Sequence, residues 1–380
     1  MRRSGMYVKQ ATGYRAFIPT PLPPKPAVKI EGELQNLLSR ADMALARLDG
    51  VAQMLPNVDL FIAMYVKKEA LLSSQIEGTQ ASLDDLFAYE SGDKLENLND
   101  VTEVVNYIKA MNYGRDRLQS LPMSLRLIKE IHAILLEGAR GSERSPGEFK
   151  RSQNWIGPPG CTLNEASYVP PPPHEALEAM GALERYFHYK ERLPILVDCA
   201  LIHYQFETIH PFLDGNGRMG RLLVTFYLCW KGVLHKPLLY LSYYFKKNRQ
   251  EYYDRLNMVR ETGNYEQWVH YFLKGVMDIS GVAMDAARQI LELQSRHRRL
   301  LWEKKISSPI AVGILEQLFY TPVISIAQIA ERFAVSYQAA STIVAQLEKI
   351  QILRETTGRK RDKRYVYSDY LNILAEGTKI

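Results

Sequence analysis

The sequence has few cysteines and no long apolar run, and both absences exclude classes of protein. Its three cysteines, Cys161, Cys199 and Cys229, lie far apart, so we expect reduced thiols rather than a disulfide framework, as in a cytoplasmic protein. No stretch approaches the length of a membrane span. Arg2 and Arg3 resemble the start of a signal peptide, but no apolar segment follows them. We therefore expect no membrane partner.

The common nucleotide-binding fingerprints are also missing. No G-x-x-x-x-G-K-[ST] stretch is present, which excludes a P-loop, and no strand pattern precedes Gly215 and Gly217, which disfavours a dinucleotide-binding fold. With 380 residues, 46% hydrophobic and 24% charged, and a net charge of +6, the chain has the composition of a globular protein of two or three domains.

One polar stretch, HPFLDGNGRMGR from His210 to Arg221, lies between two apolar segments. The apolar residues of 196–209 and of 219–230 recur at spacings of three and four, which predicts a buried helix on each side. The stretch is therefore a loop between two core helices.

The residue types in this loop suit phosphate chemistry. Gly215 and Gly217 can adopt backbone angles that let successive N–H groups converge on an anion at the start of the next helix. Arg218 and Arg221 follow, and their planar guanidinium groups can hold phosphate oxygens. Asp214 offers a hard oxygen ligand for a magnesium ion that bridges the phosphates. An anion-binding turn is the prediction.

His210 adds a group that can move a proton. Pro211 ends the preceding helix and turns the imidazole toward the loop. An imidazole that titrates near neutrality beside bound phosphate is a good general base for a hydroxyl nucleophile. Taken alone, such a histidine is more often structural, a Gly-x-Gly is usually a turn and an arginine pair is usually solvated. Their conjunction favours a catalytic site.

The loop fits H-x-F-x-[D/E]-G-N-G-R-x-x-R at every defined position and so resembles the Fic domain. Proteins of that family are mostly adenylyltransferases, which move AMP from ATP to a Ser, Thr or Tyr hydroxyl of a target protein. The resemblance implies that His210 is the base and that Asp214 binds Mg²⁺. Gly217 stands where the related Doc-type kinases carry lysine, which favours AMP transfer over phosphorylation. The ATP-binding stretch implied is Gly215, Asn216, Gly217, Arg218, Met219, Gly220 and Arg221.

A second stretch, SSQIEG from Ser73 to Gly78, has two interpretations. By spacing alone, Ser73 and Glu77 are an i, i+4 polar pair on a solvated helix face. The stretch also resembles the inhibitory motif of the family, [S/T]-x-x-x-E-[G/N]. That resemblance implies a regulatory role in which Glu77 reaches Arg221 and takes the place of the ATP γ-phosphate. Carboxylate and guanidinium groups can pair bidentately, so the competition has a physical basis.

The segments around these motifs are expected to be mostly helical. Helices are predicted within 31–55, 59–77, 82–89, 99–113, 124–137 and 174–189, after an N-terminal arm whose proline-rich run, 19–26, lies extended on the surface or docks a partner. By resemblance, the stretch before Tyr168 is a β-hairpin flap that holds a target segment by strand addition, and Ile156 and Gly157 contact ATP there.

Adenosine contacts are expected downstream of the loop. In related enzymes this region contacts adenosine, so the resemblance suggests Asn248, Tyr252 and Tyr253. Tyrosines at helical spacing are alternatively part of the core.

The C-terminal region has a different pattern. Helices are predicted at 310–319, 326–333 and 336–347, and the alternation over 352–367 predicts a hairpin around the turn GRKRDKR, which together outline a winged helix-turn-helix domain. The basic residues of this wing could contact DNA phosphates, or the domain could serve in protein docking or in formation of a homodimer. They are Arg359, Lys360, Arg361, Lys363 and Arg364.

The fold predicted is mainly α: a Fic helical core with a small β-hairpin flap, plus the C-terminal winged helix-turn-helix domain. The expected division is 1–113 for the arm and inhibitory helix, 114–305 for the catalytic core and 308–380 for the winged domain. The function expected is ATP- and magnesium-dependent transfer of AMP to target proteins and to the chain itself, autoinhibited by Glu77. The alternative is a nucleotide-sensing, DNA-binding transcription regulator.

Overall fold

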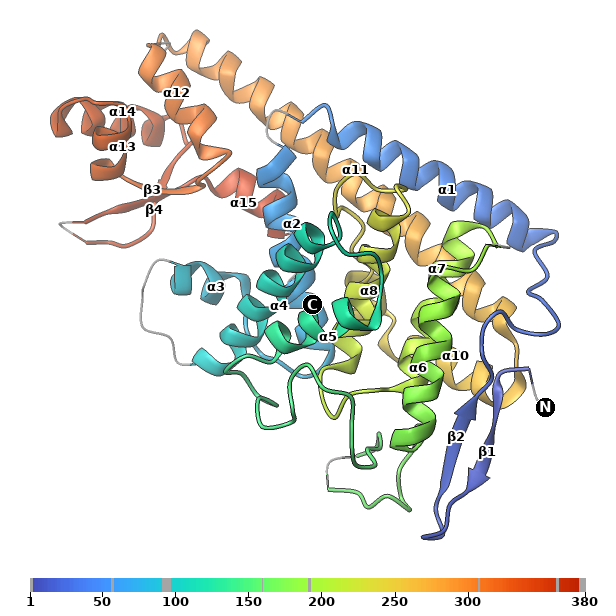
Figure 1. The fold of residues 1–380 in the computed structure, drawn as a ribbon. Helices are drawn as coiled ribbons and strands as arrows, with labels where there is room; N and C mark the ends of the chain where they lie inside the picture. Colours follow the sequence, from blue (N-terminus) through green and yellow to red (C-terminus); the bar gives the residue numbers. More distant parts are fainter. Residues whose placement is uncertain are drawn as a thin grey trace. The chain divides into compact units, whose positions relative to one another are not determined.

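The computed structural model describes residues 3–55, 58–90, 97–158, 160–190, 193–306, 308–359 and 362–375 (Figure 1). Two of the predicted wing residues, Lys360 and Arg361, lie outside these ranges. The chain divides into two compact units, one of residues 1–49 and 66–281 and the other of residues 50–65 and 282–379. No helix in the described ranges is long and apolar enough to cross a membrane.

The first unit is built from helices, as the sequence predicted. Two helices, α7 (Ile195–Ile209) and α8 (Asn216–Trp230), pack against each other at its centre, and α8 also contacts α4 and α5. Every residue from Leu196 to Ile209 is buried, since α7 is apolar on nearly all sides. The other helices that begin in or enter this unit are α1 (Glu33–Ala52), α2 (Val58–Ile76), α3 (Leu83–Glu90), α4 (Leu98–Arg117), α5 (Leu125–Leu135), α6 (Pro173–Phe187), α9 (Ser242–Lys247), α10 (Arg249–Thr262) and α11 (Tyr265–Glu303).

Local sequence signals set several helix ends. The Ser124 side chain accepts a hydrogen bond from the Leu127 N–H and so caps α5, while Pro173 occupies the first turn of α6. Gly263 ends α10 in the left-handed conformation that glycine adopts without a steric cost. The loop between α7 and α8 contains two residues of this conformation, His210 and Gly215.

An N-terminal hairpin is an element that the sequence analysis missed. Strands β1 (Gly5–Lys9) and β2 (Arg15–Pro19) pair antiparallel, with Gly5 opposite Pro19 and Lys9 opposite Arg15. The Phe17 N–H donates to the Val169 carbonyl, and the Phe17 side chain is fully buried. Residues before the proline-rich run are thus part of the packed unit rather than a surface arm. Neither strand shows the alternation of apolar and polar residues by which a strand is recognised in a sequence.

The expected flap has less β-structure than a hairpin. Ile156 and Tyr168 form one isolated antiparallel bridge, with N–H···O distances of 2.9 and 3.0 Å. The described residues between them are turns and irregular backbone.

The second unit contains the three predicted short helices and the paired strands. Helices α12 (Pro309–Leu318), α13 (Ile326–Arg332) and α14 (Tyr337–Lys349) each begin after a capping serine, and Ser325 completes a reciprocal capping box. Strands β3 (Val323–Ser325), β4 (Arg354–Glu355) and β5 (Arg364–Val366) form an antiparallel sheet in the order β3-β5-β4. A further helix, α15 (Ser368–Ala375), was not predicted.

Candidate active site

The loop between α7 and α8 is a compact turn held by its own side chains. His210 ends α7 with φ 50° and ψ 59°, and Gly215 precedes α8 with φ 73°. A non-glycine residue in this region stores strain of about 1–3 kcal/mol, so the surroundings must hold His210 there. The Asn216 amide closes the turn, because its Oδ1 accepts from the Phe212 N–H at 2.9 Å and its Nδ2 donates to the Phe212 carbonyl at 2.8 Å. Its side chain is therefore engaged within the loop.

His132 of α5 anchors the loop from below and was not anticipated from the sequence. Its Nδ1 accepts from the Gly147 N–H at 2.9 Å, so the ring proton is on Nε2, which donates to the Asp214 carbonyl at 3.0 Å. The ring stacks on Phe212 with 3.6 Å between centroids and a 4° interplanar angle. Burial lowers the pKa of His132 to about 4, so the imidazole stays neutral. A histidine within an amphipathic helix carries no motif that would identify it.

Arg221 contacts two residues of the stretch that resembles the inhibitory motif of the family, Ser73 and Glu77. Its Nε donates to the Ser73 Oγ at 2.7 Å and its Nη2 to the Ser73 carbonyl at 2.9 Å. The same Nη2 lies 2.7 Å from Glu77 Oε1. The predicted contact between the two distant stretches is thus present, through one hydrogen bond rather than a bidentate pair.

The charges of this pair reinforce each other. Burial opposes ionisation of Glu77, but the charge and hydrogen bond of Arg221 outweigh it and lower the Glu77 pKa. Burial likewise opposes the charge on Arg221, while Glu77 raises its pKa above the usual value. A side chain at position 217 would prevent the contact, because a Cβ on Gly217 would lie 2.2 Å from Glu77 Oε1. Glycine at this position is what lets the carboxylate approach.

The Arg218 side chain is more deeply buried than expected for a residue that binds phosphate. Its side chain is 2% exposed, and its Nη1 lies 3.4 Å from Oε2 of Glu103 on α4, a carboxylate that the sequence did not single out. Glu103 also accepts from the Thr79 hydroxyl at 2.8 Å and pairs with Arg140 at 3.1 Å. Through Glu103, Arg218 thereby connects the loop between α7 and α8 to Thr79, which follows the SSQIEG stretch.

Asp214 is the exposed acid of the loop. Its side chain is 38% exposed, its Oδ1 accepts from the Gly215 N–H at 2.6 Å, and its Oδ1 lies 3.7 Å from Arg218 Nη2. The loop at Gly141 comes so close that a Cβ there would lie 2.6 Å from Asp214 Oδ2. Among the described residues, no group of three or more His, Cys, Asp or Glu side chains could hold a metal ion.

The His210 imidazole is partly buried, and its Nδ1 is enclosed without a hydrogen-bond partner among the described residues. Burial, together with the nearby cations Lys150 and Arg260, lowers the pKa of His210 to about 3. The expectation of titration near neutrality is therefore wrong for this structure. The ring is neutral across the physiological range.

Three of the expected ATP contacts face the core. Met219 is fully buried, and a Cβ on Gly220 would lie 2.2 Å from Glu207 Oε1. Tyr252 is 1% exposed, and its hydroxyl bonds to His203 Nε2 at 2.9 Å, while His203 Nδ1 lies 2.9 Å from the Gly220 carbonyl. Through His203, Tyr252 is linked to the Gly220 carbonyl of α8, the helix that follows the loop.

The other expected contacts lie nearer the surface. Tyr253 is 37% exposed. Burial raises its pKa, and the charges of Glu77 and Arg221 also act on its hydroxyl, so it lies near these two residues. The Asn248 Nδ2 donates to the Tyr244 carbonyl at 3.0 Å, between α9 and α10. In the flap, Ile156 is 38% exposed, while Gly157 lies against Cys161, whose Sγ would be 2.5 Å from a Cβ at Gly157.

Glu207 of α7 is a buried acid that the sequence did not single out. Its side-chain Oε1 has no hydrogen-bond partner among the described residues. Burial raises its pKa to about 7.

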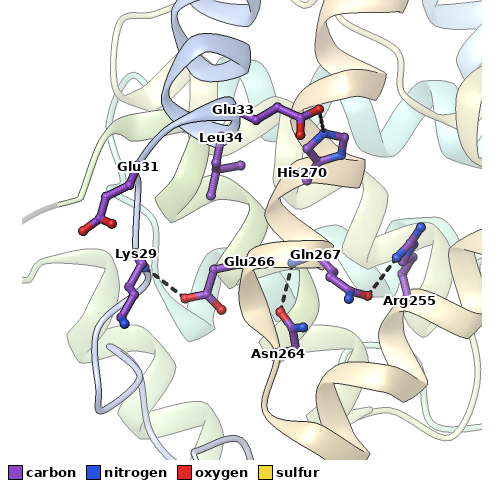
Figure 2. A pocket seen from close by; sticks show the side chains of 9 residues that line it. All are labelled: Lys29, Glu31, Glu33, Leu34, Arg255, Asn264, Glu266, Gln267 and His270. Carbon is purple, nitrogen blue, oxygen red and sulfur yellow. Dashed lines mark hydrogen bonds and ion pairs between the residues drawn. The ribbon is translucent and has the colours of Figure 1, made fainter.

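A separate cavity of about 420 Å³ in the first unit involves none of these residues (Figure 2). Its polar side chains largely satisfy one another: Arg255 donates to Gln267 at 2.9 Å, and His270 lies 3.5 Å from Glu33. The remaining lining residues are Lys29, Glu31, Leu34, Asn264 and Glu266. The candidate active site is therefore the loop between α7 and α8 and not this cavity.

The helices and the loop define the class of the protein as a helical fold in which a tight, glycine-containing turn joins two core helices. Comparison with known families identifies that class. The Fic/DOC family N-terminal model matches residues 35–116, and the Fic/DOC family model matches residues 122–228. Through these regions the chain belongs to the Fic/DOC family, as its loop motif suggested.

Curated relatives match part of the chain. The protein adenylyltransferase Fic of Drosophila willistoni is 29% identical over 179 residues, which cover 46% of this chain and 32% of that protein. The protein of the same name from Drosophila grimshawi is also 29% identical over 179 residues, 46% of this chain and 33% of that protein. The matched region thus spans about a third of these relatives.

Solved structures share the fold. A Fic family protein from Desulfovibrio desulfuricans G20 superposes with a TM-score of 0.58 at 19% identity, covering 90% of this chain and 97% of that chain. A Fic domain-containing signaling protein from Bacteroides thetaiotaomicron VPI-5482 superposes with a TM-score of 0.52 at 20% identity, covering 66% and 97%.

Proposed function

We propose that the chain transfers AMP from ATP to a Ser, Thr or Tyr hydroxyl of target proteins and of itself. The observation that carries this proposal is the loop geometry. His210, whose imidazole is kept neutral by burial and by nearby cations, ends α7 six residues before α8 begins, and the first two turns of α8 carry the buried side chains of Arg218 and Arg221. The names of the curated relatives, protein adenylyltransferase Fic, agree with it.

In the proposed reaction His210 accepts the proton of the attacking hydroxyl. The oxygen forms a bond to the α-phosphorus, the bond from that phosphorus to its bridging oxygen breaks, and pyrophosphate leaves. The N–H groups at the start of α8 and the charge on Arg221 face the phosphates, where fixed dipoles and charges stabilise developing negative charge. Positioning and electrostatics dominate phosphoryl chemistry, so no covalent enzyme intermediate is needed.

Mg²⁺ fits the one exposed carboxylate of the loop. Magnesium at nucleotide sites is commonly held by one or two carboxylates together with substrate phosphates and water, so a cluster of protein ligands is not required. Asp214 is partly exposed, and two N–H-bearing neighbours, Gly215 and Arg218, orient its Oδ1. When bound, the ion would neutralise charge on the phosphates of ATP.

We propose further that Glu77 inhibits this activity. Its carboxylate pairs with the Arg221 guanidinium, which would otherwise be free to contact the γ-phosphate of ATP. Ser73 supports the arrangement by accepting from Arg221 through both its hydroxyl and its carbonyl oxygen. ATP would then bind in a poor pose, and resting activity would be low.

Intact-mass spectrometry tests the transfer itself. After incubation with ATP and Mg²⁺ we expect an adenylyl adduct on the Glu77→Gly protein and, by tandem mass spectrometry, its location on a Ser, Thr or Tyr side chain. A phosphate adduct instead would indicate kinase chemistry. The absence of any adduct on a folded, ATP-binding protein would reject the assignment.

DNA binding through the C-terminal region is a second candidate function. The order α12, β3, α13, α14, β4 and β5 is that of a winged helix-turn-helix, which supports treating 308–380 as a functional region distinct from 1–113 and 114–305. The specific observation in its favour is the surface of α14, where Gln338, Thr342 and Gln346 are exposed, uncharged and able to read base edges. Arg359 and Lys363 are exposed in the wing.

A mobility-shift assay separates this candidate from docking or dimerisation. Duplex binding that weakens with salt, with a shallower salt dependence in Lys363→Ala and a uniform loss of affinity, is expected if the wing contacts phosphates. No retardation at low salt, combined with a dimer in light scattering, would favour the homodimer role. As a matched control we use Lys349→Ala, at the far end of α14.

A further inference from the structure

The segment before the flap bridge contacts three successive carbonyl groups of the catalytic loop. The Asn154 Nδ2 donates to the His210 carbonyl at 3.2 Å and to the Phe212 carbonyl at 2.7 Å. The backbone N–H of Lys150 donates to the carbonyl between them, that of Pro211, at 2.8 Å. All three acceptors belong to the turn that carries the His210 imidazole.

The orientation of the Asn154 amide is determined by its other partner. Its Oδ1 accepts from the Lys150 ammonium at 2.7 Å. An ammonium group can only donate, so when Lys150 is charged the amide oxygen must face it and the NH₂ group must face the loop carbonyls. Lys150 is 4% exposed, and burial lowers its pKa to about 7. The charged form of Lys150 thus determines which way the Asn154 amide faces.

His210 needs such a support. It adopts a left-handed backbone conformation that side chains with a Cβ disfavour, and the residue after it, Pro211, has no N–H with which to brace the turn. Asn216 closes the other side of the turn through Phe212, so Asn154 is the side chain that reaches the His210 carbonyl itself.

We propose that Asn154 is a positioning residue for His210, with Lys150 orienting its amide, and that together they hold the imidazole in its reactive direction. The role given to His210 rests on the proposed AMP transfer. The structural part, that Asn154 keeps the ring enclosed and its backbone left-handed, stands independently of which reaction the loop performs.

The kinetic test uses the Glu77→Gly background with ATP labelled at the α-phosphorus. Asn154→Ala removes both donors, and Asn154→Asp keeps the size and the Lys150 partner but replaces the NH₂ group by an oxygen. For both we expect kcat to fall at least tenfold with little change in KM for ATP. The matched control is Gln153→Ala, since Gln153 bonds the flap segment through the Asn154 and Pro170 carbonyls and reaches no loop carbonyl. We expect its kcat within about twofold of the background. Equal losses in all three variants would overturn the proposal.

A second readout does not depend on enzymatic activity. In ¹³C-histidine-labelled protein, the His210 resonance, assigned by its loss in His210→Ala, should report a strongly lowered pKa in the wild type. In Asn154→Ala the ring gains water and its pKa should rise toward the usual 6.5. An unchanged His210 titration in Asn154→Ala would overturn the proposal even if AMP transfer is confirmed. A raised His210 pKa in Asn154→Ala, with no AMP transfer in any variant, would support the positioning role of Asn154 and reject the proposed function.

Discussion

Replacing Glu77 by glycine should release Arg221 and raise self-labelling with ATP. Because α2 ends at Ile76, glycine at position 77 does not interrupt the helix. Arg221 keeps its two hydrogen bonds to Ser73 in the variant, so the guanidinium remains oriented toward the site. The change therefore removes the competing carboxylate while leaving the rest of the site in place.

The size of the effect follows from the contact that is lost. A charge-assisted hydrogen bond contributes about 1.5–3 kcal/mol, and the Glu77 side chain is 33% exposed, so the lower end of this range applies after screening by solvent. Since 1.4 kcal/mol corresponds to a factor of ten, we expect labelling to rise on the order of tenfold or more.

The assay compares initial rates of self-labelling at saturating ATP and Mg²⁺. Glu77→Gln, which keeps the size but not the charge, should give an intermediate rate. Adding Arg221→Ala to Glu77→Gly should cancel the gain, because the γ-phosphate then has no arginine to contact. Equal rates for wild type and Glu77→Gly, with both proteins folded, would refute the inhibitory role and return Glu77 to an ordinary surface pair.

Three further predictions test single groups of the site. His210→Ala should reduce transfer by roughly 10²- to 10⁴-fold with ATP affinity nearly unchanged, and near-normal labelling would remove His210 from the role of base. Asp214→Ala should raise the Mg²⁺ concentration needed for half-maximal rate, and superimposable magnesium titrations would exclude it as a ligand. Glu207→Gln should make the free energy of unfolding less dependent on pH, so that the variant gains stability relative to the wild type as the pH rises. The raised pKa of Glu207, about 7, makes the folded state bind the proton more tightly than the unfolded chain, so the wild type loses up to roughly 3 kcal/mol between pH 4.5 and pH 7 and the variant does not. Parallel pH–stability curves from chemical denaturation would contradict this.

The parts of the site that could be predicted from sequence are those encoded by local patterns. The helix-turn-helix around His210, the glycine at position 215 and the likeness of SSQIEG to an inhibitory motif all follow from contiguous residues, and the contact from Glu77 to Arg221 is present as expected. The family resemblance, rather than periodicity, supplied that long-range pairing.

The supporting residues could not be predicted because tertiary packing determines their roles. His132 and Glu103 lie 82 and 115 residues along the chain from the residues they contact, Asp214 and Arg218. Asn154 lies 56 residues from His210, in irregular backbone without a sequence pattern. The expectation that His210 titrates near neutrality was wrong for the same reason, because its lowered pKa depends on burial and on cations from other segments. Met219 was assigned to ATP by its position in the motif and Tyr252 by its place downstream of it, and both side chains are buried in the core, the alternative that the spacing of the tyrosines had left open.

The most direct test of AMP transfer compares two labels on the same nucleotide. Glu77→Gly protein is incubated with Mg²⁺ and ATP labelled either at the α- or at the γ-phosphorus, then denatured and counted, with Glu77→Gly/His210→Ala as the control. We predict stable incorporation of the α label, no incorporation of the γ label, and loss of the α signal in the control. Incorporation of the γ label, or α labelling that survives in the His210→Ala control, would contradict transfer of AMP by this loop.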